Sequence, residues 1–352
     1  MLYLTLLLCF FLSLIITPSV KKLAFSVGAT DNPNQRKVHT KTMPRLGGLA
    51  VFISFFAGML IIGPIHQYCN YILFGSIIII LTGIIDDIIE LSPKMKLLGQ
   101  LIPAGTVLYG GLHIDFISLP FGMKLEFGWM SIPITLLWII GITNSINLID
   151  GLDGLASGVS AIALLSISGM AVLMNDWYVS SVGFILLASI LGFLPYNFHP
   201  ATIFLGDSGS LFLGYMIAVL SLLGFKNVTF ISFIVPIVIL GVPISDTLFA
   251  IIRRVTTNKP FSAPDKYHLH HCLLHIGFSH RQTVLIIYIM AVFFGAIGVI
   301  ITKSNLRGTY IFIGILILML ELFAEKIGWV GKEFKPLLKI AQLFRLSPGK
   351  NE

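Results

Sequence analysis

Adjacent and glycine-flanked carboxylates are the groups in this sequence best suited to bind a metal ion. Asp86 and Asp87 are neighbours, and Asp207 lies in the segment GDSGS at 206–210. Adjacent like charges become tolerable when a divalent cation neutralises them. Oxygen ligands of this kind, completed by water and by substrate phosphates, suit Mg²⁺ better than zinc, with Mn²⁺ as the alternative. We therefore predict a magnesium site that also binds phosphate.

Amides and carboxylates recur at steps of three residues further along the chain. The four positions are Asn144, Asn147, Asp150 and Asp153. Steps of three keep successive side chains on one side of a helix, so we expect one continuous strip. Gly151 and Gly154 then break the turn, and the glycines around Asp207 repeat this arrangement. Because free N–H groups at a helix N-terminus bind phosphate, we expect both helix starts to face an anion.

A basic, histidine-rich loop supplies complementary donors. Its members are Arg253, Arg254, Lys259, Lys266, His268, His270 and His271. The Arg and Lys residues alone would fit the ordinary bias of cytoplasmic loops. A zinc site is disfavoured, because three imidazoles within four residues rarely give a tetrahedral set. Beside a magnesium cluster, we interpret the imidazoles and guanidiniums as clamps on a diphosphate. His275 and His280 lack such neighbours and are interpreted as interfacial polar residues.

A second basic segment precedes a glycine pair near the N-terminus. Arg36, Lys37, His39 and Lys41 are followed by the run PRLGG, which contains Arg45, Gly47 and Gly48. The glycine pair would allow either the close approach of a loop to a ligand or the tight packing of helices. The sequence leaves both interpretations open.

The composition shows which elements must position these groups. Hydrophobic residues make up 56% of the 352 residues and charged residues 11%, and the mean hydropathy is +0.93. A soluble domain carries about 25% charged residues. Apolar runs of about 20 residues recur, where a β-barrel would show short alternating segments. We predict an all-α integral membrane protein, which excludes the secreted, cytosolic and disordered classes.

The apolar runs predict about eleven membrane spans. They lie at about 2–20, 47–64, 71–88, 97–112, 129–147, 155–174, 178–195, 209–225, 228–250, 284–302 and 308–325. Pro195 is expected to end the seventh span early, and Gly141 to blur the end of the fifth. Pro236 and Pro243 are expected to kink the ninth span.

Basic residues set the predicted orientation. With the N-terminus outside, 19 of the 23 Lys and Arg lie on the cytoplasmic side, together with the C-terminus and the aspartates at the span ends. The net charge of +7 thus follows from topology and does not indicate nucleic-acid binding. A helix end at the headgroups explains any single aspartate. It does not explain the group, because helix C-termini prefer cations and Asp86 and Asp87 follow an apolar run.

We expect one transmembrane domain at 1–325 and a basic tail at 326–352. Apolar residues recur at helical spacing in the tail, which we place on the anionic inner leaflet. An external stretch at 113–128 alternates around Pro120-Phe121-Gly122 and predicts a short hairpin.

Five motifs together resemble the polyprenyl-phosphate N-acetylhexosamine-1-phosphate transferase superfamily. They are RKVHTKTMPRLGG (36–48), GIIDD (83–87), NSINLIDGLDGLASG (144–158), FLGDSGSLFLG (204–214) and PFSAPDKYHLHH (260–271). They occur in the family's order and cover nearly the whole chain. The interrupted pattern HLHH is similar to the WecA and TagO type, whereas the MraY branch typically has three consecutive histidines. The first motif looks TagO-like, which implies teichoic-acid synthesis at a bacterial cell membrane.

The resemblance implies roles for the acids. Asp207 and Asn147 would hold Mg²⁺ at the diphosphate of a sugar nucleotide. Asp86 would deprotonate or orient a lipid phosphate with support from Asp87, and Asp150 would order the metal shell.

The resemblance also implies how substrates are held. Asp153 would hydrogen-bond uracil, Phe204 would stack on it, and Asn144 belongs to the same strip. The residues implied to contact diphosphate, sugar or lipid phosphate are Lys41, Arg45, Lys96, Arg253, Arg254, His268, His270 and His271.

The implied reaction is attack by undecaprenyl phosphate on the β-phosphorus of UDP-GlcNAc, with release of UMP. Another donor, such as UDP-MurNAc-pentapeptide or UDP-GalNAc, is the alternative within this class. A secondary transporter is the alternative outside it, although acids gathered at one face do not favour it. A one-step or a two-step route stays open, and a homodimer is a possible assembly.

Overall fold

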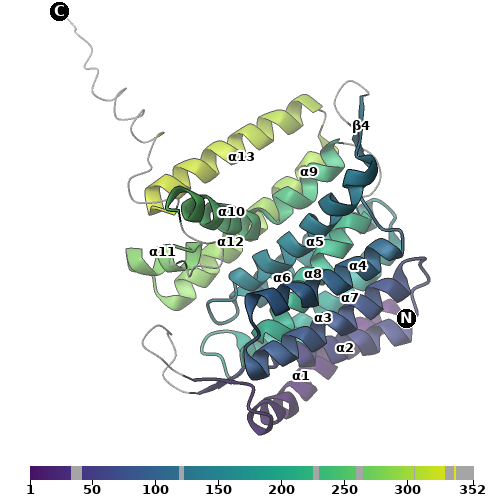
Figure 1. Cartoon of the computed structure of the whole chain (residues 1–352), viewed down its shortest axis with the longest axis vertical. Coiled ribbons are helices and arrows are strands. Elements are labelled where there is room, and N and C mark those ends of the chain that lie inside the picture. Colours follow the sequence, from purple (N-terminus) through teal and green to yellow (C-terminus); the bar gives the residue numbers. More distant parts are fainter. Residues whose placement is uncertain are drawn as a thin grey trace, which may run out of the picture.

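The computed structural model describes residues 1–32, 42–118, 123–224, 230–258, 265, 267–304, 306–329 and 337. Helices lie side by side and dominate the molecule (Figure 1). They are α1 (Leu2–Ser26), α2 (Gly47–Ile62), α3 (Cys69–Ile89), α4 (Pro93–Tyr109), α5 (Ser131–Leu148), α6 (Leu155–Leu173), α7 (Trp177–Asn197), α8 (Gly206–Gly224), α9 (Phe230–Ile239), α10 (Gly241–Thr256), α11 (Leu269–Ile276), α12 (His280–Lys303) and α13 (Leu306–Ile327). The prediction of an all-α membrane protein is confirmed.

Two short antiparallel ribbons accompany the helices. β1 (Thr30–Asp31) pairs with β2 (Met43–Pro44) just before α2. β3 (Phe116–Ser118) pairs with β4 (Lys124–Glu126) in the stretch where the sequence predicts a hairpin, so that prediction is confirmed. β4 and the N-terminus lie at one end of the molecule, and α11 lies at the other (Figure 1).

Seven helices within the described residues are long and apolar enough to cross a membrane. They are Leu2–Ser26, Cys69–Ile89, Gly128–Leu148, Leu155–Leu173, Trp177–Asn197, Gly206–Gly224 and His280–Thr302, and Gly47–Ile62 is apolar but shorter. The chain is therefore a multi-pass membrane protein.

Three helix boundaries differ from the predicted spans. The segment expected as one span at 228–250 is two helices, because Pro236 and Pro243 flank an interruption at Leu240. The expectation that Pro195 ends the seventh span is wrong: the proline lies inside α7, which continues to Asn197. Gly141 does not disturb α5, which runs unbroken to Leu148.

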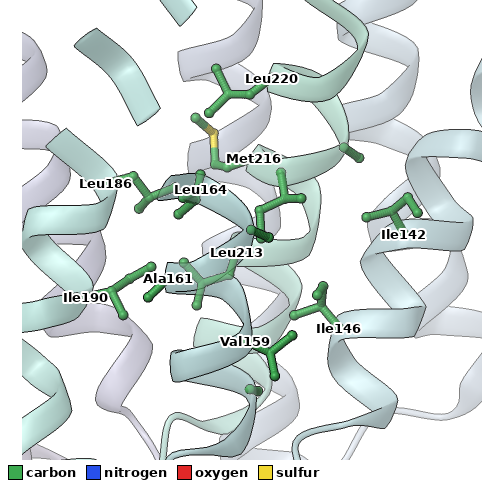
Figure 2. Close-up of a cluster of buried hydrophobic side chains, with 14 of the residues drawn as sticks. Ile142, Ile146, Val159, Ala161, Leu164, Leu186, Ile190, Leu213, Met216 and Leu220 are labelled. Carbon is green, nitrogen blue, oxygen red and sulfur yellow. The ribbon is translucent and has the colours of Figure 1, made fainter. Parts of the chain in front are cut away.

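Helix α8 forms the centre of the fold. It packs against both α3 and α5. Of the residues in its most apolar stretch, 89% are buried inside the protein. Leu213, Met216 and Leu220 of α8 point among side chains of α5, α6 and α7 (Figure 2). Close packing on every side holds the start of α8, and thus Asp207, in a fixed position.

The glycine pair before α2 is explained by helix packing. A Cβ on Gly48 would lie 2.1 Å from the backbone of Gly209, and a Cβ on Gly47 would lie 2.5 Å from the carbonyl oxygen of Phe204. Of the two interpretations that the sequence allows, the structure supports the tight packing of α2 on α8.

Gly48→Ala is therefore expected to lower thermal stability and transferase activity together. Two backbones would have to separate, and overpacking of this kind costs about 1–3 kcal/mol. Gly105→Ala is the matched control, because a Cβ on this glycine of α4 meets nothing within 4 Å. Thermal unfolding in detergent and a turnover assay measure both effects. Equal melting temperatures for the two variants would contradict the packing argument.

Candidate active site

The carboxylate of Asp207 is the meeting point of four elements. Its Oδ1 accepts hydrogen bonds from Lys96 Nζ of α4 at 2.8 Å and from Asn147 Nδ2 of α5 at 2.5 Å. Its Oδ2 accepts from Arg45, in the segment before α2, at 3.0 Å. Asn147 also donates to the hydroxyl of Ser210, one turn further along α8, at 2.8 Å. The first turn of α8 is thus surrounded by polar groups from α4, α5 and the chain before α2.

Asp86 joins this group through Lys96. The Lys96 ammonium lies 2.7 Å from Asp86 Oδ2 and 2.8 Å from Asp207 Oδ1, so the two carboxylates flank one cation. The other oxygen of Asp86 accepts the backbone N–H of Leu91 at 2.7 Å, which fixes its position at the end of α3. The predicted convergence of Asp86, Asn147 and Asp207 is confirmed.

Asp87 caps the start of α8. Its two oxygens accept the backbone N–H groups of Asp207 at 2.8 Å and of Ser208 at 2.9 Å, and its side chain is 0% exposed. A carboxylate is favourable at a helix N-terminus, because it satisfies free N–H groups and complements the dipole. The anion at the start of α8 is thus the carboxylate of Asp87, which accepts from two of its free N–H groups. A phosphate contact at this helix start stays a prediction.

Backbone pairing brings Arg45 to the acids. Phe204 donates its N–H to Pro44 at 2.8 Å, and Gly47 and Gly48 donate theirs to Phe204 and Leu205 at 3.0 and 2.8 Å. Arg45 Nε then lies 3.4 Å from Asp87 Oδ1. These bonds join the segment before α2 directly to the segment before α8. The sequence does not reveal this contact, because the two segments are far apart in the chain.

The sequence predicts that four polar residues continue along one side of the helix at the end of α5, and only the first two of them lie on that helix. Asn144 and Asn147 lie on α5, whereas Asp150 and Asp153 follow its last residue, Leu148, in a turn. Asn144 forms a reciprocal amide pair with Gln100 of α4, at 2.6 and 3.3 Å. This pair holds α4 beside α5. Gln100 gave no signal in the sequence, because a single amide matches no motif.

Asp150 lies in the turn beyond α5, and burial together with the nearby Asp207 carboxylate raises its pKa to about 8. The raised pKa means that neutral pH favours its protonated form. A divalent cation beside Asp207 would favour the ionised form instead.

The histidine motif is anchored by Asp246 of α10. Its Oδ2 lies 2.9 Å from Nδ1 of His268, and its Oδ1 accepts the N–H of Leu269 at 2.8 Å. The indole N–H of Trp329 also donates to Oδ1, at 2.9 Å. A buried carboxylate with three donors fixes the ring of His268 and leaves its Nε2 as the outward nitrogen. Trp329 was missed because a lone tryptophan after the last apolar run carries no pattern.

The other motif histidines differ in exposure. His270 is 3% exposed, and burial followed by its neighbour His271 lowers its pKa to about 3, so its ring is neutral at pH 7. A Cβ on Gly151 would lie 2.4 Å from Nε2 of His270, which places this ring against the acidic turn. His271 is half-buried, and burial also lowers its pKa. The histidine loop and the acidic turn therefore meet, as predicted.

The two arginines of α10 are placed differently. Arg253 is buried and donates through Nε to Asp265 at 3.0 Å, through Nη2 to the same carboxylate, and through Nη1 to the carbonyl of Trp329. These bonds tie the loop to the chain beyond α13. Arg254 has a buried Nε without a hydrogen-bond partner among the described residues. Of the two, Arg254 retains more capacity to bind a diphosphate.

The remaining predicted residues are Asp153, Phe204 and Lys41. Asp153 Oδ2 lies 2.9 Å from Nδ1 of His199 and accepts the N–H of Ala201 at 3.1 Å. Phe204 lies two residues before α8 and is half-buried. Lys41 lies outside the described residues. No observation tests the uracil contacts implied for Asp153 and Phe204, and these stay predictions.

The donor set of the cluster fits magnesium. Asp86 and Asp207 offer carboxylate oxygens, and the amide of Asn147 would offer its oxygen after a flip. Asp86 Oδ2 is buried without a well-aligned hydrogen bond among the described residues, although Lys96 Nζ lies 2.7 Å away. Three carboxylates, with Asp87 included, face the two cations Arg45 and Lys96, so the cluster can accept further positive charge.

Known proteins are similar to this chain in sequence over most of its length. The model for "Glycosyl transferase family 4" matches residues 69–225. A probable undecaprenyl-phosphate N-acetylglucosaminyl 1-phosphate transferase of Bacillus subtilis (strain 168) is 50% identical over 93% of this chain and 92% of its own. A decaprenyl-phosphate N-acetylglucosaminephosphotransferase of Mycobacterium tuberculosis (strain CDC 1551 / Oshkosh) is 35% identical over 80% of this chain and 78% of its own.

A phospho-N-acetylmuramoyl-pentapeptide-transferase of Halalkalibacterium halodurans is 28% identical over 85% of this chain and 96% of its own. Fold and site thus define a multi-pass membrane phosphotransferase with an acidic centre. The chain belongs to the polyprenyl-phosphate N-acetylhexosamine-1-phosphate transferase family and is of the WecA and TagO type.

Proposed function

We propose that the protein transfers GlcNAc-1-phosphate from UDP-GlcNAc to undecaprenyl phosphate in a magnesium-dependent reaction. The products are undecaprenyl-diphospho-GlcNAc and UMP. The observation that carries the proposal is the position of Asp207, whose carboxylate accepts hydrogen bonds from Arg45, Lys96 and Asn147. Lys96 also forms an ion pair with Asp86, so the two acids lie at the same place. Phosphoryl transfer needs little besides positioning and charge neutralisation, which this cluster supplies.

The residues divide into an acidic and a basic set. Bound Mg²⁺, held by Asp207 and Asn147, would neutralise charge that develops on the diphosphate. Asp86 accepts the proton of the lipid phosphate or orients its oxygen toward the β-phosphorus. Lys96 and Arg45, already at the cluster, would steady the phosphate groups. A new bond forms between the lipid phosphate oxygen and the β-phosphorus of the donor. The bond between the β-phosphorus and the bridging oxygen breaks, and UMP leaves with that oxygen.

The histidine loop would bind the sugar-diphosphate part of the donor. His268 presents its outward nitrogen while Asp246 holds the ring, and the ring of His271 lies beside that of His270, with centroids 4.2 Å apart. The pattern HLHH and the names of the Bacillus and Mycobacterium relatives support UDP-GlcNAc as the donor. The Halalkalibacterium relative, at 28% identity, makes UDP-MurNAc-pentapeptide the alternative donor.

The site should open to the cytoplasm of a bacterial cell, at the inner face of the plasma membrane. The sugar nucleotide is water-soluble and the acceptor is a lipid, so the reaction requires a boundary between the two. The apolar runs support about eleven spans. The bias of Lys and Arg supports an N-terminus on the outside. The TagO-like first motif supports a role at the first membrane step of teichoic acid synthesis.

A donor-specificity assay tests this proposal. Purified protein receives undecaprenyl phosphate with radiolabelled UDP-GlcNAc, UDP-GalNAc or UDP-MurNAc-pentapeptide, with Mg²⁺ or with a chelator. We expect lipid-linked product and UMP from UDP-GlcNAc alone, and loss of product on chelation. Product from another donor, or undiminished turnover in chelator, would contradict the corresponding part of the assignment.

Asp246→Asn is expected to lower kcat/KM for the donor by at least about 10-fold. The amide cannot accept from His268, Leu269 and Trp329 as the carboxylate does, so the ring of His268 loses its fixed orientation. Trp329→Phe, which removes one of these donors, should give a smaller decrease. Trp129→Phe is the control, since that indole is 79% exposed. Wild-type kinetics in Asp246→Asn would show that the loop needs no such anchor.

A further inference from the structure

Three side chains of the types that bind metal ions converge near the turn that carries Asp150. Asp153 lies in the turn between α5 and α6, His199 follows α7, and His280 begins α12. One ligand atom of each lies within 4.8 Å of the other two. We propose that these residues form a site for a divalent transition ion of the zinc class, with a donor set different from that of the magnesium cluster.

Asp153 and His199 are already held in a suitable geometry. Nδ1 of His199 and Oδ2 of Asp153 are 2.9 Å apart, and the N–H of Ala201 donates to the same oxygen at 3.1 Å. The side chains of His199 and Asp153 are 35% and 17% exposed. Solvent therefore reaches the pair, so that an ion could enter without unfolding of the surrounding helices.

His280 supplies the third ligand. Its ring stacks on that of His199, with centroids 4.1 Å apart and planes at 24°. Neither ring nitrogen of His280 makes a well-aligned hydrogen bond within the described part of the chain, although both are buried and the backbone of Asp153 lies alongside. The backbone of Asp153 can satisfy one of the two nitrogens, and buried polar atoms are rarely left without partners, so a metal ion would satisfy the other. The sequence predicts His280 as an interfacial polar residue, and the structure places it against His199 and Asp153.

The donor set selects the class of ion. Two imidazoles and one carboxylate form a typical three-ligand zinc site, with the fourth position open to water. Mg²⁺ prefers oxygen and would remain at Asp207. Binding requires Nδ1 of His199 without its proton, which a neutral imidazole achieves by moving the proton to Nε2.

The ion would join three segments that are distant in sequence. The turn after α5, the segment after α7 and the start of α12 each contribute one ligand, and Tyr288 of α12 already donates to the carbonyl of Gly154 at 2.5 Å. An ion that binds the folded arrangement alone must stabilise it. Thermal stability is thus a measure of binding that does not depend on transferase activity.

Titration of the full-length protein in detergent with Co²⁺ tests the site. We expect one Co²⁺ per chain, with visible absorption typical of a low-coordinate nitrogen and oxygen site. His199→Gln and His280→Gln should each weaken binding by more than the roughly 10-fold to 100-fold cost of losing an outer partner of a metal ligand. Ser279 and Gln282 keep their capping box in His280→Gln, so α12 should start normally.

Two variants control for the other histidines. His275→Gln makes the same change at an exposed position of α11 and should bind Co²⁺ as the wild type does. His271→Gln tests the histidine loop as the source of the signal. Zn²⁺ should raise the melting temperature of the wild type and of both controls, but not of His280→Gln. Unchanged Co²⁺ binding in His199→Gln and His280→Gln, or loss of binding in His271→Gln alone, would overturn the proposal.

Discussion

Asp207→Asn is expected to reduce turnover by at least about 10³-fold while the protein still folds and inserts. The asparagine is almost the same size, so the packing of α8 should be kept. It removes one negative charge from the oxygens that now receive Lys96, Asn147 and Arg45. Two cations are then left with less compensation, and the proposed Mg²⁺ would lose its central carboxylate. We expect the Mg²⁺ concentration for half-maximal activity to rise in any residual turnover.

Asp176→Asn is the matched control. This aspartate caps α7 by accepting the N–H of Val179 at 3.0 Å, and asparagine is an equally good cap. Asp176 lies just before the first residue of α7, at the end of this helix opposite to the segment that carries His199 and leads to α8. The same change is thus made at the helix end away from the acidic cluster. Turnover, melting temperature and membrane insertion are measured for both variants. Wild-type turnover and Mg²⁺ response in Asp207→Asn would remove the basis of the proposed mechanism.

Asp86→Asn is expected to lower kcat by about 10²–10⁴-fold, the usual contribution of a positioned acid–base group. The amide oxygen can still accept from Leu91, so the end of α3 should keep its shape. The side chain can no longer take a proton from the lipid phosphate, and Lys96 loses one of its two anionic partners. Because Asp86 is assigned to the acceptor, binding of the sugar nucleotide should be nearly unchanged.

Glu90→Gln controls for the loss of charge near the end of α3. Glu90 follows α3 directly, and its side chain is exposed. Calorimetric binding of UDP-GlcNAc and steady-state turnover separate the two steps. Loss of donor binding in Asp86→Asn would assign this residue to the donor. Full turnover in Asp86→Asn would exclude it as base or positioning group.

Much of the fold follows from hydropathy. Long apolar runs specify helices, because a backbone in lipid must satisfy its hydrogen bonds internally. The ends of α3 and α5 lie within a few residues of the predicted span ends. The interruption between α9 and α10 and the continuation of α7 past Pro195 are less predictable. A proline in a membrane helix can either break it or be tolerated, and neighbouring helices decide which.

The sequence alone singles out the acids, amides and histidines that are candidates for the chemistry, because ionisable groups in an apolar chain are few and costly. It also predicts that they meet, and Asp86, Asn147 and Asp207 do meet. Type and spacing therefore determine the membrane class, the family and the membership of the acidic cluster.

Only the tertiary structure decides which partner each group takes. It turns Asp87 toward the start of α8, joins Asp246 to Trp329, and stacks His280 on His199. Each of these contacts links residues far apart in the chain, and local pattern carries no information about such distances. The physical reason is packing: once α8 lies between α3 and α5, the positions of the side chains at its start are fixed by the neighbouring helices.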